Sequence, residues 1–248
     1  HEVGCMSPAP RAWFVSRIEE SKAPEFNVVE LDPRSKEELR GYKENDRLGG
    51  NDPYSASKAA IEIVFQSYLN SFFLKKNKIG IGTARAGNVI GGGDWSKNRI
   101  IPDCIRTIIR KKSLVVRNPL STRPWQHVLE PVSGYLLLGK KLFINPRKFS
   151  GSWNFGPSAN EVKNVKEVAK IIISHIEKGR KTRIIFKKGS FEEANLLKLN
   201  SEKANKFLNW KTKWTMNQAL KKTAVWYNFF LKKKNTKELT DKQIENYF

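Results

Sequence analysis

The residues whose types and spacing point most directly to chemistry are a tyrosine and a lysine four positions apart. Tyr54 and Lys58 lie within the run Tyr-Ser-Ala-Ser-Lys, and in a helix this spacing places both side chains on one face. An ammonium group close to a phenol favours the phenolate and lowers the pKa of the tyrosine, which suits the pair to acid–base catalysis. The alternative is a surface pair without chemistry, because about 0.8 pairs of this spacing are expected by chance among 6 Tyr and 32 Lys in 248 residues.

The position of this pair strengthens the catalytic interpretation. Asp52 is a typical N-cap residue, and Pro53 suits the first helical position because no amide donor is needed there. Apolar residues at helical spacing extend the predicted helix over residues 53–72. The pair therefore lies in the first turns of a capped helix.

A second candidate site follows a predicted buried strand at residues 78–85. Arg85 ends this strand, and Asn88 lies in the loop that follows, residues 87–98, which is rich in Gly and Asn. Ligands of open α/β sheets bind at the carboxyl ends of the strands. Glycine allows close approach of the backbone to a ligand, and Arg and Asn donate to phosphate or sugar oxygens. An ordinary glycine-rich turn is the alternative.

A third cluster brings Arg117, Arg123, Trp125 and His127 within eleven residues. A guanidinium group in this cluster could pair with a diphosphate, and the indole could form a pocket wall. For His127 we favour a structural role beside the tryptophan over a role as a catalytic base.

The rest of the chain alternates between helix and strand patterns, which predicts an α/β protein with parallel strands. Residues 1–39 show no sustained periodicity, the residues after 231 resemble a polar tail, and a Gly-x-Gly-x-x-Gly fingerprint is absent. The expected helices are 102–110, one starting near 131, 165–176, 201–208 and 217–231, and the further strands are 114–116, 152–155 and 183–186.

The charge balance is strongly basic. Forty-six Lys and Arg against 24 Asp and Glu give a formal net charge of +22, which would suit a nucleic-acid-binding protein. However, 32 of the basic residues are scattered lysines, whereas surfaces that read bases favour arginine. We therefore expect a lysine-rich surface without a nucleic-acid partner. No membrane span, signal peptide or metal site is expected, and the prediction is a soluble cytoplasmic protein.

Together these segments resemble the CDP-glucose 4,6-dehydratases, which belong to the extended short-chain dehydrogenase/reductase family. The resemblance covers about residues 41–231, and its most specific motif is Arg-Pro-Trp-Gln-His-Val-Leu-Glu-Pro, which begins at Arg123. The matching segments are 41–60, 85–95, 99–106, 123–131 and 153–157.

The resemblance implies a bound NAD that oxidises C4 of the glucosyl unit of CDP-glucose. Tyr54 would take the hydroxyl proton, and Lys58 would hold the nicotinamide ribose and lower the pKa of the tyrosine. Elimination of water across C5–C6 and return of the hydride would give CDP-4-keto-6-deoxyglucose. The other implied contacts are Arg85 with the cofactor, Asn88 and Arg123 with the substrate diphosphate, and Arg99 and Asn154 in the substrate pocket.

The resemblance also implies a partial Rossmann-like parallel sheet with a smaller C-terminal substrate-binding lobe. We assign residues 40–95 to the Rossmann-like domain and 96–248 to the lobe, with 130–157 returning to the Rossmann layer. Residues 1–39 match no part of the family's nucleotide-binding half. We therefore expect a truncated chain with impaired activity, and the alternative is a non-catalytic basic remnant that binds a nucleotide or another polyanion. Helices like that at 53–72 form dimer bundles in the superfamily, which makes a homodimer an expected assembly.

Overall fold

A parallel sheet forms one end of the molecule. The computed structural model describes residues 12–16, 41–49, 53–74, 79–157, 163–177, 182–187 and 198–248. The sheet has the strand order β1-β2-β7, and both neighbours run parallel to β2. The carboxyl ends of the three strands therefore share one edge. Their bounds are Ala12–Ser16 for β1, Gly80–Ala86 for β2 and Gly151–Phe155 for β7.

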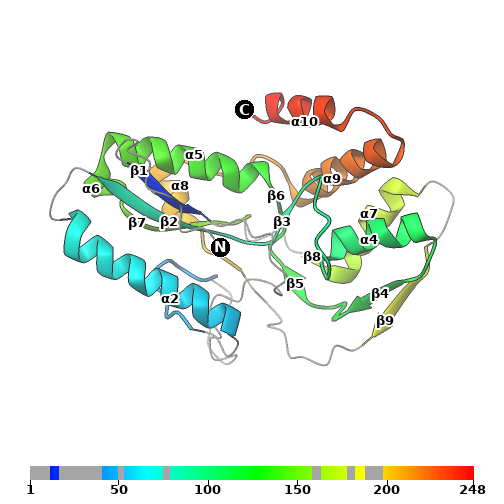
Figure 1. The fold of residues 1–248 in the computed structure, drawn as a ribbon, viewed down its shortest axis with the longest axis horizontal. Helices are drawn as coiled ribbons and strands as arrows, with labels where there is room; N and C mark the ends of the chain where they lie inside the picture. Colours follow the sequence, from blue (N-terminus) through cyan, green and yellow to red (C-terminus); the bar gives the residue numbers. More distant parts are fainter. Residues whose placement is uncertain are drawn as a thin grey trace.

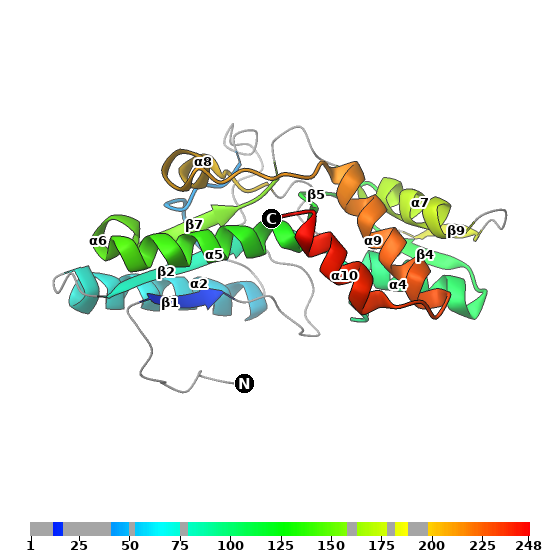
Figure 2. The same cartoon turned by 90° about the horizontal axis from the view of Figure 1, so that it is seen from above.

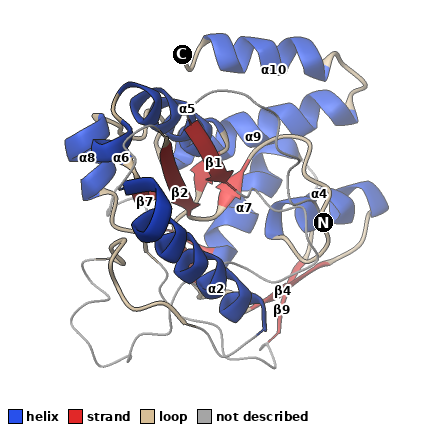
Figure 3. Ribbon diagram, turned by 60° about the vertical axis from the view of Figure 1, so that its left-hand side comes forward, coloured by secondary structure: helices blue, strands red, loops and turns tan. Residues whose placement is uncertain are grey.

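Helices cover both faces of this sheet. Figure 1 shows α5 (Leu129–Ile144) along one side and α2 (Pro53–Tyr68) along the other, and Figure 3 shows the same layering from a second direction. Side chains alternate along β7, so one face of the sheet is apolar and the other is polar. Trp153 and Phe155 join the apolar cluster beneath α5, whereas Ser152 hydrogen-bonds to Glu62 of α2. The α2 helix continues as a π-helical segment, Leu69–Phe73.

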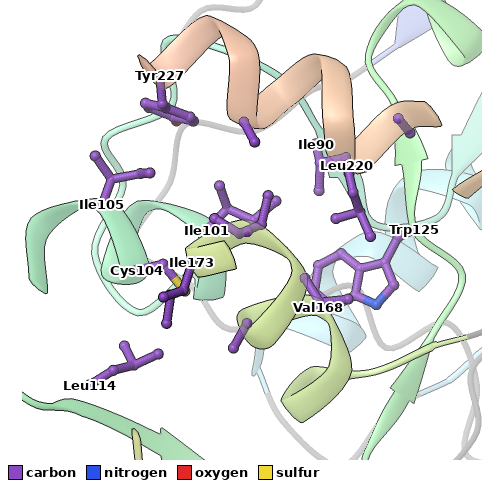
Figure 4. Close-up of a cluster of buried hydrophobic side chains, with 14 of the residues drawn as sticks. Ile90, Ile101, Cys104, Ile105, Leu114, Trp125, Val168, Ile173, Leu220 and Tyr227 are labelled. Carbon is purple, nitrogen blue, oxygen red and sulfur yellow. The ribbon is translucent and has the colours of Figure 1, made fainter. Parts of the chain in front are cut away.

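A helical lobe forms the other end of the molecule (Figure 2). Its core lies between α4 (Ile100–Arg110), α7 (Val165–Ile176) and α9 (Met216–Leu231). Figure 4 shows side chains of these three helices converging with Trp125 and Leu114. The parallel pair β4 (Leu114–Arg117) and β9 (Ile184–Lys187) flanks the lobe.

Short strand pairs connect the two ends. The parallel pair β3–β6 joins the segment after β2 to the segment before α5, and the antiparallel pair β5–β8 joins the arginine-rich segment to the start of α7. The bounds are Val89–Ile90 for β3, Thr122–Arg123 for β5, Gln126–His127 for β6, Lys163–Asn164 for β8, Pro146–Phe149 for α6 and Glu202–Leu208 for α8.

The parallel pairings confirm the predicted α/β class, and the helix predicted at residues 165–176 coincides with α7. The prediction of a polar tail after residue 231 is wrong, because α10 (Thr236–Glu245) follows there and Tyr247 is buried. Hydrogen bonds attach α10 to α9, from Trp226 Nε1 to Thr240 Oγ1 and from the Gln243 amide to the Lys222 carbonyl. Polar contacts of this kind leave no apolar periodicity in the sequence. The strand β1 likewise lies in a segment where no element was expected.

Two classes of feature are absent from the part of the chain that the structure describes. None of its helices is long and apolar enough to cross a membrane. None of its His, Cys, Asp and Glu side chains form a group of three or more that could hold a metal ion.

Candidate functional site

The amino-terminal end of α2 lies at the carboxyl edge of the sheet. Glu62 contacts Thr83 and Arg85, near the end of β2, whereas the later residue Leu69 packs in a cluster with Ile81, near its beginning. The helix therefore runs antiparallel to β2. With a rise of about 1.5 Å per residue, Lys58 lies about 6 Å beyond Glu62 toward this edge, and the backbone of Tyr54 lies about 12 Å beyond it.

A buried polar network attaches α2 to the sheet. Arg85 binds Glu62 through two bonds, from Nε to Oε1 at 3.0 Å and from Nη2 to Oε2 at 2.8 Å. The hydroxyls of Thr83 and Ser152 also donate to Oε2 of Glu62, each at 3.0 Å. Gln66, one helical turn later, donates to Ser152 at 3.1 Å. Four donors thus converge on a single carboxylate of α2.

Burial and hydrogen bonding act in opposite directions on Glu62. Burial works to raise the pKa of this carboxyl group, but the hydrogen bonds from Arg85, Ser152 and Thr83, together with the charge of Arg85, outweigh it and lower the pKa. The side chains of Arg85 and Glu62 are only 10% and 13% exposed. The pair is therefore an ionised ion pair that is largely shielded from water.

The segment before α2 closes over the end of β7. Glu44 accepts a hydrogen bond from the backbone amide of Asn154 at 2.9 Å, and the Asn154 side-chain amide donates to the carbonyl of Tyr42 at 2.9 Å. Burial raises the pKa of Glu44 despite this bond and the nearby charges of Lys203 and Arg85. The Nη1 of Arg85 donates to the carbonyl of Glu44 at 3.3 Å. Arg85 therefore contacts both α2 and this segment.

The glycine-rich loop is held by the helical lobe. The carbonyl of Asp94 accepts the Tyr227 hydroxyl at 2.5 Å, and its carboxylate pairs with Arg99 at 3.2 Å. A Cβ on Gly92 would lie 2.1 Å from the Trp226 ring, and Gly93 has a φ of +84°. Packing and backbone conformation thus require glycine at both positions, in agreement with the ordinary-turn alternative for this part of the loop.

The arginine-rich segment meets the same edge of the sheet. The backbone amide of Gln126 donates to the carbonyl of Asn88 at 2.9 Å, and its side-chain amide donates to the carbonyl of Phe155 at 2.8 Å. Arg123 is 1% exposed, and its Nη1 donates to the carbonyl of Thr122 at 2.9 Å. The structure thus brings Asn88, Gln126 and the end of β7 together.

Two buried acceptors at this edge have no donor within the described structure, namely Gln126 Oε1 and Asn154 Oδ1. A buried acceptor that stays unpaired costs about 1–3 kcal/mol. The hydroxyl groups of a sugar or ribose are donors that would satisfy such oxygens. The two oxygens are therefore acceptors whose donors the described part of the chain does not supply.

His127 has the surroundings of a structural residue. Its ring lies 4.8 Å from that of Trp214 in an edge-to-face arrangement, and its Nδ1 accepts the Leu129 amide at 3.4 Å. Burial lowers the pKa of His127 to about 4, and the charge of Lys222 acts in the same direction. The imidazole is therefore neutral at physiological pH.

The low pKa of His127 predicts a loss of stability in mild acid. Below its ordinary pKa of 6.5 the unfolded chain binds a proton that the folded chain refuses, so stability is lost as the pH falls from 6.5 toward 4. At 1.36 kcal/mol per unit the full loss is about 3 kcal/mol. Urea unfolding at pH 7, 5.5 and 4.5 should show this loss, and His127→Phe should remove it. The exposed His175 provides the control, since His175→Gln should leave the slope unchanged.

Three polar residues of this site were not predicted from the sequence: Glu44, Glu62 and Gln126. Glu62 lies four residues after Lys58 on the predicted helix, a spacing that places both on one face. Glu44 and Gln126 lie inside the segments that carry the resemblance. The partners of Glu44 and Gln126 are distant in the sequence, and no local pattern indicates these two residues.

The layered parallel sheet, its polar carboxyl edge and the adjoining lobe define a Rossmann-like α/β protein with a C-terminal helical lobe. The family model of GDP-mannose 4,6 dehydratase matches residues 35–223, and the chain belongs to this family. The match confirms the resemblance to the nucleotide-sugar dehydratases of the extended short-chain dehydrogenase/reductase class.

Individual relatives agree with this assignment. The curated CDP-glucose 4,6-dehydratase of Salmonella typhimurium (strain LT2) is 36% identical over 217 residues. These residues are 86% of this chain, which spans 60% of the length of that relative.

Solved structures show the same fold at lower identity. The dTDP-glucose 4,6-dehydratase of Bacillus anthracis str. Ames in complex with NAD has a TM-score of 0.63 at 24% identity, over 83% of this chain and 63% of that one. The UDP-glucose 4-epimerase of Thermotoga maritima with UDP-glucose has a TM-score of 0.67 at 14% identity, over 89% of this chain and 64% of that one.

Proposed function

We propose that this chain provides the acid–base helix and the substrate lobe of an NAD-dependent CDP-glucose 4,6-dehydratase. The observation that carries the proposal is the 36% identity to the Salmonella enzyme of that activity over 86% of the chain. The antiparallel placement of α2 on β2 supports it, since Tyr54 and Lys58 then belong to the edge where ligands of such sheets bind. The alternative, a non-catalytic polyanion-binding protein, is an outcome of the test below.

The residues of this edge fit a nicotinamide cofactor and a sugar in chemical type. The unpaired oxygens of Asn154 and Gln126 are acceptors for hydroxyl donors. Lys58 would hold the nicotinamide ribose, and its charge would lower the pKa of Tyr54. The bound NAD would supply reversible uptake of a hydride. Tyr54 would take the proton from the C4 hydroxyl as the hydride leaves C4, and the C4 oxygen would stay a carbonyl in the product.

The substrate contacts in this proposal come from four segments. Arg123 and Asn88 would bind the diphosphate, because a guanidinium–phosphate contact is charge-assisted and bidentate. Arg99 at the start of α4 and Asn154 at the end of β7 would contact the remainder of the ligand. The product would be CDP-4-keto-6-deoxyglucose.

We place the protein in the cytoplasm as a homodimer, and the exposed apolar side chains of Ile61, Ile63 and Val64 on α2 support the dimer.

Binding of CDP-glucose by this chain should raise its melting temperature, and Arg123→Lys should reduce the shift. At a hundredfold excess over the Kd a ligand stabilises by about 2.7 kcal/mol, which is a shift of about 5–10 °C at this chain length. The lysine keeps one charge and most of the buried stem, so loss of the shift reports the bidentate contact. Differential scanning fluorimetry at several ligand concentrations measures the effect.

Arg117→Lys is the matched control, because Arg117 lies in the same segment but is exposed. It should retain the full shift. A wild-type shift that Arg123→Lys leaves intact would remove Arg123 from the site. An equal shift with inorganic pyrophosphate that disappears in moderate salt would favour the polyanion-binding alternative.

A further inference from the structure

One network joins α2, the segment before it, and the strands β2 and β7. Arg85 on β2 contacts Glu62 on α2 and the carbonyl of Glu44 in the preceding segment. The carboxylate of Glu44 in turn binds the backbone of Asn154 on β7. All three guanidinium nitrogens of Arg85 thus have partners within the chain. The resemblance implied a cofactor contact for Arg85, and these contacts point to a further role within the chain.

The hydrogen bonds of this network require a particular orientation of α2, whereas the apolar contacts of α2 do not. The buried residues Phe65 and Leu69 form a cluster with Ile81 near the amino end of β2, away from the candidate site. Apolar packing of this kind opposes separation of the helix from the sheet but fixes its rotation only weakly. A bidentate guanidinium–carboxylate pair requires one relative orientation of its two groups. Arg85 and Glu62 supply this constraint one helical turn from Lys58.

Stability alone does not account for the pair. A buried ion pair is often no more stabilising than well-packed apolar residues of similar volume, because both charges lose their hydration. The hydroxyls of Thr83 and Ser152 donate to the same carboxylate, so two further polar groups are committed to this one orientation of α2. The arrangement specifies a geometry more than it stabilises a fold.

We infer that Arg85 and Glu62 are positioning residues, which hold the first turns of α2 so that Tyr54 and Lys58 act together at the carboxyl edge of the sheet. This inference rests on the function proposed above. Neither residue touches substrate or cofactor in this role. Their effect reaches the reacting groups through the backbone of α2, over one helical turn to Lys58 and two to Tyr54.

The test is a pH titration of Tyr54 in the 248-residue chain. NMR of tyrosine labelled with ¹³C at Cζ monitors the titration. The signal of Tyr54 is assigned by its loss in Tyr54→Phe. In the unaltered chain we expect the pKa of Tyr54 below its ordinary value. In Glu62→Gln and in Arg85→Lys, which keep the size of the side chains, we expect it to return toward that value by about 1 unit.

A destabilised control separates positioning from a merely structural role. Thr215→Ala removes the side-chain cap of α9, which lies in the other lobe, and should cost about 1 kcal/mol of stability. It should leave the titration of Tyr54 unchanged. Ser152→Ala keeps the ion pair and removes one donor to Glu62, so it should give a smaller shift than Glu62→Gln and offers a milder variant if the latter does not fold.

The outcomes distinguish the two proposals. A lowered pKa of Tyr54 that persists in Glu62→Gln, Arg85→Lys and Ser152→Ala would overturn the positioning role and leave the proposed function intact. An ordinary pKa of Tyr54 in the unaltered chain would overturn the acid–base assignment, and the positioning role with it. A shift in Thr215→Ala as large as in Glu62→Gln would show that general loss of stability is the cause.

Discussion

Tyr54→Phe should lower the rate of keto-sugar formation from CDP-glucose by about 10²–10⁴, the usual contribution of a positioned acid–base group. The substitution removes the phenolic oxygen alone, so the binding of CDP-glucose should be nearly unchanged and the loss should fall on kcat. Because this chain spans 60% of the Salmonella relative, the assay uses a hybrid in which the preceding part of that enzyme is joined to residues 41–248. The absorbance of the 4-keto sugar in alkali follows the product.

Lys58→Met in the same hybrid should impair cofactor binding and turnover together, since one ammonium group serves both in the proposed mechanism. The exposed Lys140 offers a control of the same kind, and Lys140→Met should have no effect. A hybrid that is active and keeps its full rate with Phe at position 54 would exclude the mechanism. A folded hybrid without activity would favour the non-catalytic alternative for this chain.

The largest effect on stability is expected for Glu130→Ala. The Glu130 side chain is fully buried and accepts three hydrogen bonds, from the backbone amides of Lys213 and Trp214 at 3.0 and 2.9 Å and from the hydroxyl of Tyr247 at 2.6 Å. Its removal takes the acceptor away from all three donors and opens a cavity at a fully buried position. We expect the free energy of unfolding to fall by about 3–5 kcal/mol. Urea unfolding monitored by tryptophan fluorescence measures this change.

Two comparisons test the cause of that loss. Tyr247→Phe removes only one of the three donors and should cost about 1.5–3 kcal/mol, the usual range for a hydrogen bond to a charged group. Glu202→Ala affects an exposed ion pair with Lys43 at 3.7 Å, and should cost less than about 1 kcal/mol. If Glu130→Ala is no more destabilising than Glu202→Ala, the hydrogen bonds to Glu130 do not hold the C-terminal segment in place.

Local patterns in the sequence were enough to predict most of the helices and strands that position the site. The α7 helix follows a capping box, in which the side chains of Asn164 and Glu167 bond each other's backbone amides, and its apolar residues recur at helical spacing. The residues that predict α2, the cap and the apolar spacing, lie within the helix or next to it, and those that predict β2 lie within the strand. Interactions of this range involve neighbours in the chain, so residue types alone indicate them.

The same local reasoning indicated Tyr54 and Lys58 as a pair and the loop after β2 as a ligand-facing segment. It did not indicate Glu62, whose partner Arg85 lies 23 positions away, nor Glu130, whose partners lie 83 to 117 positions away. These carboxylates were not distinguishable from the other acidic residues of the chain. Only the folded chain brings their donors within hydrogen-bonding distance.

The C-terminal segment shows the physical reason for this division. The α10 helix has few apolar residues and docks through single hydrogen bonds from Trp226 and Gln243, and Tyr247 behind it reaches Glu130. Periodicity reports the burial of an apolar face, which the sequence of a helix determines by itself. A hydrogen bond to a distant residue depends on where the tertiary structure places that residue. The sequence therefore determined the class and most of the elements and predicted the tyrosine–lysine pair, and the tertiary structure decided which buried carboxylates receive hydrogen bonds and which groups contact α2.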